Sequence, residues 1–307
     1  MNLIRNRSFT AALLYWVGLV LALNFSQPLK ASASTNAPIV RVSGLCKFIL
    51  HDYQLSKSSE ASVNMVVKDL LKKLQNSFEF TTTTNPTICI RVFGAFEDFR
   101  DFAQKSRGPR DGEHAGVVMS NLAGYYSLNT REVVMWQQKD RMFFGNSLLH
   151  ECSHAIMHDK FRHVPIWLDE GCAVHFAFPP YMQDPSDRQM LISHRLLMNR
   201  YLSRDKLPEL RAFLNMSDNE FRGMPSESSY QVSWSLFEFL ITTPQRRKAM
   251  NQMLKRIQAT DMTHADCARL LDEAYPGGLV RMEKDWRDWI IRSAGTVRDW
   301  RLIEKQE

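Results

Sequence analysis

The spacing of apolar residues changes period along the chain and predicts both strands and helices. The stretches Val40–Leu50 and 87–93 are short runs rich in β-branched residues, which indicates strands. Between them, apolar residues recur at steps of three and four from Val63 to Phe78, which predicts an amphipathic helix. A second, shorter helix is expected over Phe96–Phe102, followed by a loop over 106–114.

The pattern becomes mainly helical in the second half of the chain. Before that change, two apolar runs flank Asn129-Thr130 and predict a β-hairpin of Gly124–Leu128 and Glu132–Trp136. The expected helices cover residues 143–158, 166–178, 186–202, 230–242, 245–258, 263–274 and 278–292. We therefore expect an α+β fold in which a strand-rich N-terminal lobe, residues 34–142, is followed by a helical lobe, residues 143–307.

The first 33 residues have the pattern of a secretory signal peptide. Arg5 and Arg7 precede the apolar run Ala11–Leu23, and the small residues 31–33 offer a cleavage site. The apolar run is shorter than the about 20 residues that a membrane-spanning helix needs. We expect residues 1–33 to be removed and the chain to be secreted or periplasmic, without a membrane span after cleavage; an uncleaved membrane anchor is the alternative.

Composition and charge limit the class of protein and the kinds of partner that we expect. Hydrophobic residues make up 44% and charged residues 23%, which excludes a disordered chain. The formal charge of +6 suggests an anionic partner such as nucleic acid, but Arg5, Arg7 and Lys30 lie in the predicted leader and leave 36 basic against 33 acidic residues. The basic run 246–248 is short, lies on an expected helix, and is not joined by an aromatic-interleaved basic strand. We expect no nucleic-acid partner.

The five cysteines do not form a metal-binding pattern, because no C-x-x-C occurs. Their odd number leaves at least one thiol outside any intramolecular bridge. Cys46 and Cys89 both lie in expected strands and could form a disulfide in an oxidising compartment. The alternative is that both are unpaired thiols, buried as small hydrophobic side chains.

An H-E-x-x-H motif, His150-Glu151-Cys152-Ser153-His154, lies at the junction of the two lobes. On a helix, residues four apart lie on one face, so both imidazoles can reach one metal ion. Glu151 lies beside them, where its carboxylate can contact a metal-bound water. We therefore expect His150 and His154 to be metal ligands and Glu151 to be catalytic; two surface histidines with an unrelated glutamate are the alternative.

A catalytic zinc site needs a third protein ligand and one open position. Glu170 follows His154 by sixteen residues, and Pro165 suits the first turn of a second helix that returns toward the first. Two histidines and one glutamate form a known catalytic zinc set. Asp169 is a rival, but it points about 100° away from Glu170 on a helix. We expect one Zn²⁺ ion, held by His150, His154 and Glu170.

The remaining histidines are weaker candidates for the third ligand. His158 continues the same helical face but lies roughly 12 Å from His150 along the axis, so we expect it beside the site or at the surface. His163 and His175 are further weak candidates for the third ligand. The metzincin pattern requires glycine three and histidine six residues after the second motif histidine, where this chain has methionine and lysine.

The motif, followed by Trp167-Leu168-x-Glu170-Gly171, resembles the gluzincin zinc metallopeptidases, and most of all the bacterial peptidase-MA-like proteins. Weaker similarities extend over roughly residues 40–292. They are an apolar strand followed by an aromatic-acidic helix over 90–99, and a strand that begins Gly124-Tyr125-Tyr126. They also include a helix with the pattern Tyr-x-x-Ser-Trp at Tyr230–Trp234, and a late segment in which Gly277-Gly278 precedes Trp286. The resemblance implies a zincin-like fold whose N-terminal lobe precedes an active-site helix. It also implies a catalytic role for Tyr230 as a donor to the reacting oxygen, with packing beside Trp234 as the alternative.

The function expected from these residues is an exported zinc-dependent metallopeptidase that acts on a peptide or protein substrate. Glu151 would assist the attack of a zinc-bound water on the peptide carbonyl. No G-x-M-E-N segment precedes Gly124, so an endopeptidase is favoured over an aminopeptidase.

The strand Glu132–Trp136 is expected to be buried, and the alternative is that it offers an edge to which an extended peptide can add. A non-catalytic zinc-containing binding module and a cell-wall peptide amidase remain alternatives, and Tyr181 and His194 are lesser candidates for the oxygen donor.

Overall fold

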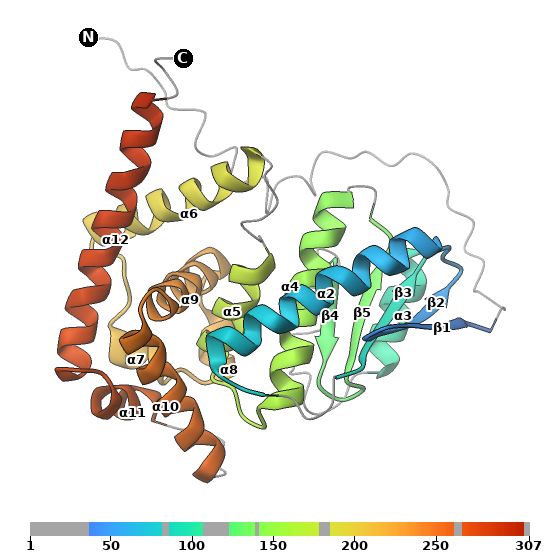
Figure 1. The fold of residues 1–307 in the computed structure, drawn as a ribbon, viewed down its shortest axis with the longest axis horizontal. Coiled ribbons are helices and arrows are strands. Elements are labelled where there is room, and N and C mark those ends of the chain that lie inside the picture. The colour runs from blue at the N-terminus through green and yellow to red at the C-terminus, as the bar shows by residue number, and fades with distance from the viewer. Residues whose placement is uncertain are drawn as a thin grey trace.

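A mixed five-stranded β-sheet precedes a mostly helical part of the chain (Figure 1). The strands are β1 (Ile39–Ser43), β2 (Cys46–His51), β3 (Ile88–Phe93), β4 (Gly124–Ser127) and β5 (Glu132–Trp136). In the sheet order β1-β2-β3-β5-β4, the three central strands are parallel and the two edge strands antiparallel. The computed structural model describes residues 37–81, 86–106, 123–138, 141–177, 185–260 and 266–303. The α+β class and the predicted hairpin are confirmed, whereas the predicted signal peptide and nearly all of the predicted 106–114 loop lie outside the described residues.

The stretch Val40–Leu50 was predicted as one strand, and this was wrong: it forms the antiparallel pair β1 and β2. Gly44 has a φ of +56°, in the left-handed region that favours glycine, and the turn around it reverses the chain. A Cβ atom there would also collide with the side-chain amide of Asn64, which accepts a hydrogen bond from the Leu45 backbone at 2.7 Å. Ser43-Gly44, a dipeptide typical of turns, interrupts the apolar pattern here, and the single-strand prediction overlooked it.

Helices cover both faces of the sheet. Helix α2 (Lys57–Phe78) and helix α4 (Arg141–Lys160) pack on one face, and helix α3 (Phe96–Ser106) packs on the other (Figure 1). The structure begins α2 six residues before the predicted start, because the Ser56 hydroxyl accepts a hydrogen bond from the Ser59 backbone and caps the helix.

The two cysteines considered for a disulfide lie on opposite faces of the sheet. In the parallel pairing of β2 with β3, Cys46 is opposite Ile88 and Lys47 is opposite Cys89. Side chains alternate between faces along a strand, so this one-residue offset directs the two thiols away from each other. Both are free, which excludes the bridge, and burial raises the pKa of Cys46 to about 12.

The helical part follows the predicted segments closely. Its helices are α5 (Ile166–Ala177), α6 (Pro185–Ser203), α7 (Leu210–Leu214), α8 (Asp218–Gly223), α9 (Ser226–Ile241), α10 (Pro244–Thr260), α11 (Cys267–Ala274) and α12 (Gly278–Ile303). Helices α7 and α8 were not predicted, because five or six residues are too few to show a helical period. None of the helices that the structure describes is both long enough and apolar enough to cross a membrane.

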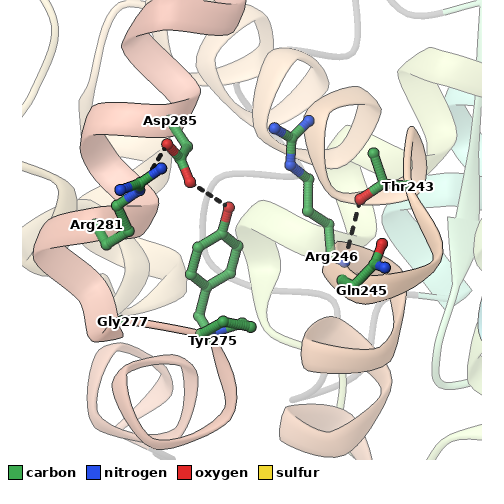
Figure 2. Close-up of a pocket in the computed structure, with 8 residues that line it drawn as sticks. Thr243, Gln245, Arg246, Tyr275, Gly277, Arg281 and Asp285 are labelled. Carbon is green, nitrogen blue, oxygen red and sulfur yellow. Dashed lines mark hydrogen bonds and ion pairs between the residues drawn. The ribbon is translucent and has the colours of Figure 1, made fainter.

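The turn between α11 and α12 borders an open hollow of about 480 Å³. Asp285 on α12 accepts hydrogen bonds from the Tyr275 hydroxyl at 3.0 Å and from Nε of Arg281 at 2.9 Å (Figure 2). Gly277 and Gly278 have φ values of +88° and +78°, which make the turn between the two helices possible. No residue predicted to carry chemistry lines this hollow.

Two histidines packed within the helical part are expected to make the fold sensitive to acid. His175 on α5 lies edge-on against Phe237, and burial together with the nearby charge of Lys73 lowers its pKa to about 4. Burial also lowers the pKa of His194 on α6 to about 4. A histidine in the unfolded chain has a pKa of about 6.5, so below this pH the unfolded state binds more protons than the folded state. The free energy of unfolding should therefore fall as the pH is lowered from about 6.5 to about 4.

Urea denaturation at pH 7 and at pH 4.5 measures this effect. We expect the midpoint of wild type to be lower at pH 4.5. The variant His175→Met lacks one of the two titrating groups and should lose less stability over the same interval. An equal loss in wild type and in His175→Met would contradict the assignment.

Candidate metal centre

Helix α4 carries both motif histidines on one face. The Nε2 atoms of His150 and His154 lie 3.2 Å apart, one helical turn from each other. Cys152, between them in sequence, is fully buried among the apolar residues of the core, and burial raises the pKa of its thiol well above the ordinary value. The helical face predicted from the spacing is therefore present, and the cysteine is directed away from it.

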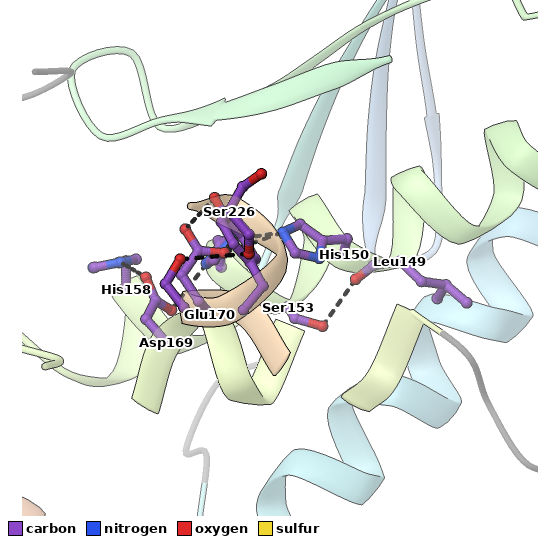
Figure 3. A network of polar contacts seen from close by, with 10 residues as sticks. Leu149, His150, Ser153, His158, Asp169, Glu170 and Ser226 are labelled. Atoms are coloured by element: carbon purple, nitrogen blue, oxygen red, sulfur yellow. Dashed lines mark hydrogen bonds and ion pairs between the residues drawn. The ribbon is translucent and has the colours of Figure 1, made fainter. Parts of the chain in front are cut away.

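Helix α5 brings Glu170 to the same point. The helix begins after Pro165, whose carbonyl accepts its first backbone hydrogen bonds. Oε2 of Glu170 lies 3.5 Å from Nε2 of His150 and 3.7 Å from Nε2 of His154, and the ligand atoms of these three residues all lie within 4.8 Å of one another (Figure 3). This oxygen is buried and accepts no hydrogen bond within the described part of the chain. A buried carboxylate oxygen between two imidazole nitrogens fits a bound cation.

A close contact between α5 and α9 brings Tyr230 to this group. A Cβ atom on Gly171 would collide with the backbone carbonyl of Ser233 on α9, so glycine allows the two helices to approach. Tyr230 lies one turn before Ser233, and its hydroxyl donates to Oε1 of Glu170 at 3.5 Å. The negative charge of Glu170, and then burial, raise the pKa of Tyr230. The hydroxyl thus contacts Glu170 in the candidate metal group, which consists of His150, His154 and Glu170. The Tyr230 ring also packs against Phe221.

Glu151 is half-buried on α4, directly after His150. Its charge contributes to the raised pKa values of both His154 and Tyr230. Its carboxylate therefore acts electrostatically on groups from α4 and from α9. Glu151 is not one of the three residues whose ligand atoms cluster on α4 and α5.

Asp169, considered in the sequence as a rival ligand, instead lies behind His154. Its Oδ1 atom is 2.9 Å from Nδ1 of His154, and its Oδ2 atom accepts a hydrogen bond from Nε2 of His158 at 2.8 Å (Figure 3). Burial disfavours the charged carboxylate, but the two imidazoles outweigh burial and hold the pKa of Asp169 well below its usual range. A carboxylate at the outer nitrogen of a metal-binding histidine orients the ring and increases its basicity.

The position of Asp169 also determines which nitrogen of His154 is available to an ion. Burial alone would lower the pKa of His154, but the Asp169 carboxylate, followed by Glu170 and Glu151, raises it to about 10. With Nδ1 facing Asp169, the Nε2 atom points toward His150 and Glu170. A second cluster, His154, His158 and Asp169, also has ligand atoms within 4.8 Å, but its two histidines are already paired with the two oxygens of Asp169, at 2.9 and 2.8 Å. The first group is thus the better cation site.

The other candidates from the sequence lie elsewhere. His175 packs edge-on against Phe176 and Phe237, and His194 packs against Trp234 with ring centroids 5.1 Å apart. His163 belongs to neither metal-binding cluster found among the described residues. Tyr181 lies outside the described residues. The sequence had identified Asp169 as a rival ligand and His158 as a residue beside the site or at the surface; what it did not predict is that Asp169 contacts both His154 and His158.

Comparison of the sequence with known families and proteins adds no evidence about this cluster of residues. No protein-family model matches the chain, and no curated protein matches it. Its chemistry therefore rests on the residues themselves and on how they are arranged.

Proposed function

We propose that this chain is an exported zinc metallopeptidase, a gluzincin-like endopeptidase with a zincin-like fold. The observation that carries the proposal is the convergence of His150, His154 and Glu170 around one point, with Glu151 beside it. This donor set of two imidazoles and one carboxylate is the one that catalytic zinc sites use while leaving a position open. A purely structural zinc site commonly has four protein ligands, and the described residues offer three in this cluster.

The surroundings of α4 support a peptide as the substrate. β5 lies between β3 and β4, as expected for a buried strand, so the edge of the described sheet nearest α4 is β4. An extended peptide can add to such an edge through backbone hydrogen bonds, next to the helix that carries His150 and His154. The alternative edge at Glu132–Trp136 is not available, because β5 is paired on both sides.

Each residue of the group has a separate task in the proposed reaction. His150, His154 and Glu170 would hold a zinc ion, which supplies Lewis acidity and lowers the pKa of a bound water toward about 7. The Glu151 carboxylate accepts the proton of the attacking water and then donates it to the nitrogen of the leaving amine. Asp169 holds the His154 ring through Nδ1. The Tyr230 hydroxyl donates to the carbonyl oxygen as that oxygen gains negative charge.

Zinc analysis together with cleavage of a mixed peptide library tests the proposal on the wild-type protein. We expect one zinc ion per chain and cleavage at internal peptide bonds. Zinc without cleavage of any peptide would favour the binding module. Cleavage confined to peptidoglycan stem peptides would favour the cell-wall amidase, and a chain that binds no zinc would contradict the site.

The variant Tyr230→Phe tests the oxygen donor. Loss of one donor to a developing oxyanion lowers kcat by about 10²–10³-fold, so we expect a fall of that order with little change in KM or zinc content. Tyr275→Phe is the matched control, because the Tyr275 hydroxyl bonds Asp285 on α12 and does not contact the metal group. If kcat of Tyr230→Phe stays within twofold of wild type, the role of Tyr230 is packing alone.

A further inference from the structure

His158 joins the metal group to the sheet through two contacts. It lies one helical turn after His154 on α4, and its Nε2 atom donates to Oδ2 of Asp169 at 2.8 Å (Figure 3). Its ring stacks on Tyr126 of β4, with centroids 5.9 Å apart and an angle of 17° between the planes. His158 is therefore connected both to the carboxylate behind a metal ligand and to a strand.

Strand β4 is an edge strand, and its side chains alternate between two environments. Tyr126 pairs with Val133 and faces the core shared with α4, whereas Tyr125 pairs with Val134 and faces α3. Tyr126 is half-buried, and its ring is held against α4 by the stacking on His158. Burial raises the pKa of its hydroxyl to about 12. A displacement of β4 would therefore move Tyr126 and change its stacking contact with the ring of His158.

We infer that His158 is a positioning residue that links edge strand β4, through Asp169, to the orientation of His154. The inference rests on the proposed function, because it assigns the same group as the metal site and the same edge as the peptide-binding strand. The continuous path is Tyr126, His158, Asp169 and His154, and each step is a measured contact. A peptide that pairs with β4 would hold Tyr126 in place and thereby hold the imidazole that binds the metal.

Two substitutions separate the two contacts of His158. His158→Gln keeps a hydrogen-bond donor near the position of Nε2 but removes the aromatic ring. His158→Phe keeps a ring that can stack on Tyr126 but removes the donor to Asp169. The readouts are the zinc dissociation constant from chelator competition, the visible spectrum of the cobalt-substituted protein, and KM and kcat for a peptide substrate.

The expected results differ between the variants. His158→Phe should bind zinc about tenfold more weakly and show an altered cobalt spectrum, at the lower end of the 10- to 100-fold typical of outer partners of metal ligands, because His158 acts through Asp169. His158→Gln should keep the zinc affinity within twofold of wild type and raise KM severalfold with little change in kcat, because only the contact with β4 is lost.

His51→Phe is a matched control on the opposite face of the sheet. His51 also makes one polar contact, with Arg91 at 2.7 Å, and also stacks on an aromatic ring, that of Phe93 at 4.4 Å. This variant should leave zinc affinity and KM unchanged. The inference is overturned if His158→Phe keeps the wild-type zinc affinity and cobalt spectrum, or if His158→Gln weakens zinc binding as much as His158→Phe does. Either result would leave the proposed function intact, whereas a wild-type chain that binds no zinc would remove both.

Discussion

Replacing Glu151 with glutamine is expected to lower kcat/KM for peptide cleavage by about 10²–10⁴-fold while one zinc ion stays bound to each chain. Glutamine has nearly the same shape as glutamate but cannot accept the proton of the attacking water. The three ligand residues are unchanged, so the metal should remain. Activity and zinc content are measured on the same preparation, so that a loss of activity is not confused with a loss of metal.

The matched control for this variant is Glu283→Gln. Glu283 is also a partly exposed glutamate within a helix, and it pairs with Arg287 on α12 rather than with the metal group. It should keep wild-type activity and zinc content. Wild-type activity in Glu151→Gln would contradict the assigned base, and loss of zinc from this variant would instead indicate that Glu151 supports the ligands.

Replacing Glu170 with glutamine is expected to weaken zinc binding by more than about 100-fold, beyond the range typical of residues behind the ligands. The substitution removes the only negative charge among the three proposed ligands and leaves an amide that coordinates zinc poorly. Its effect is separable from folding, because the amide can still occupy the buried position between the imidazoles. Chelator competition gives the zinc affinity, and circular dichroism verifies the fold.

Glu238→Gln is the corresponding control for a buried carboxylate. Glu238 on α9 is 9% exposed and accepts a hydrogen bond from Arg195 at 2.8 Å, and it belongs to neither metal-binding cluster of the described residues. Its substitution can alter stability, but zinc affinity should stay within twofold of wild type. If Glu170→Gln binds zinc as wild type does, the third ligand must be reassigned, and Asp169→Asn would then be the variant to examine.

Local sequence rules predicted most of the secondary structure, and their failures have identifiable causes. The predicted helix over 166–178 is confirmed as α5. Its signals, the apolar pattern and Pro165 at the helix start, are local in the sequence and do not depend on the rest of the fold. The prediction of one strand over Val40–Leu50 was wrong, because Gly44, with its positive φ, reverses the chain between the two strands. The Cys46–Cys89 bridge was excluded by a one-residue offset between neighbouring strands, which depends on pairing register and not on composition.

The sequence by itself determined the part of the candidate site that lies within one helix. The pitch of an α-helix is the same in every protein, so a four-residue spacing places His150 and His154 on one face wherever α4 lies. What the tertiary structure decided is everything that joins different helices. The 100° between Asp169 and Glu170 separates their directions, but only the packing of α5 on α4 places one beside Nδ1 of His154 and the other beside Nε2. Likewise, the approach of α9 to α5 at Gly171 brings the Tyr230 hydroxyl to Glu170, because relative positions of helices depend on contacts between residues far apart in sequence, which no local spacing encodes.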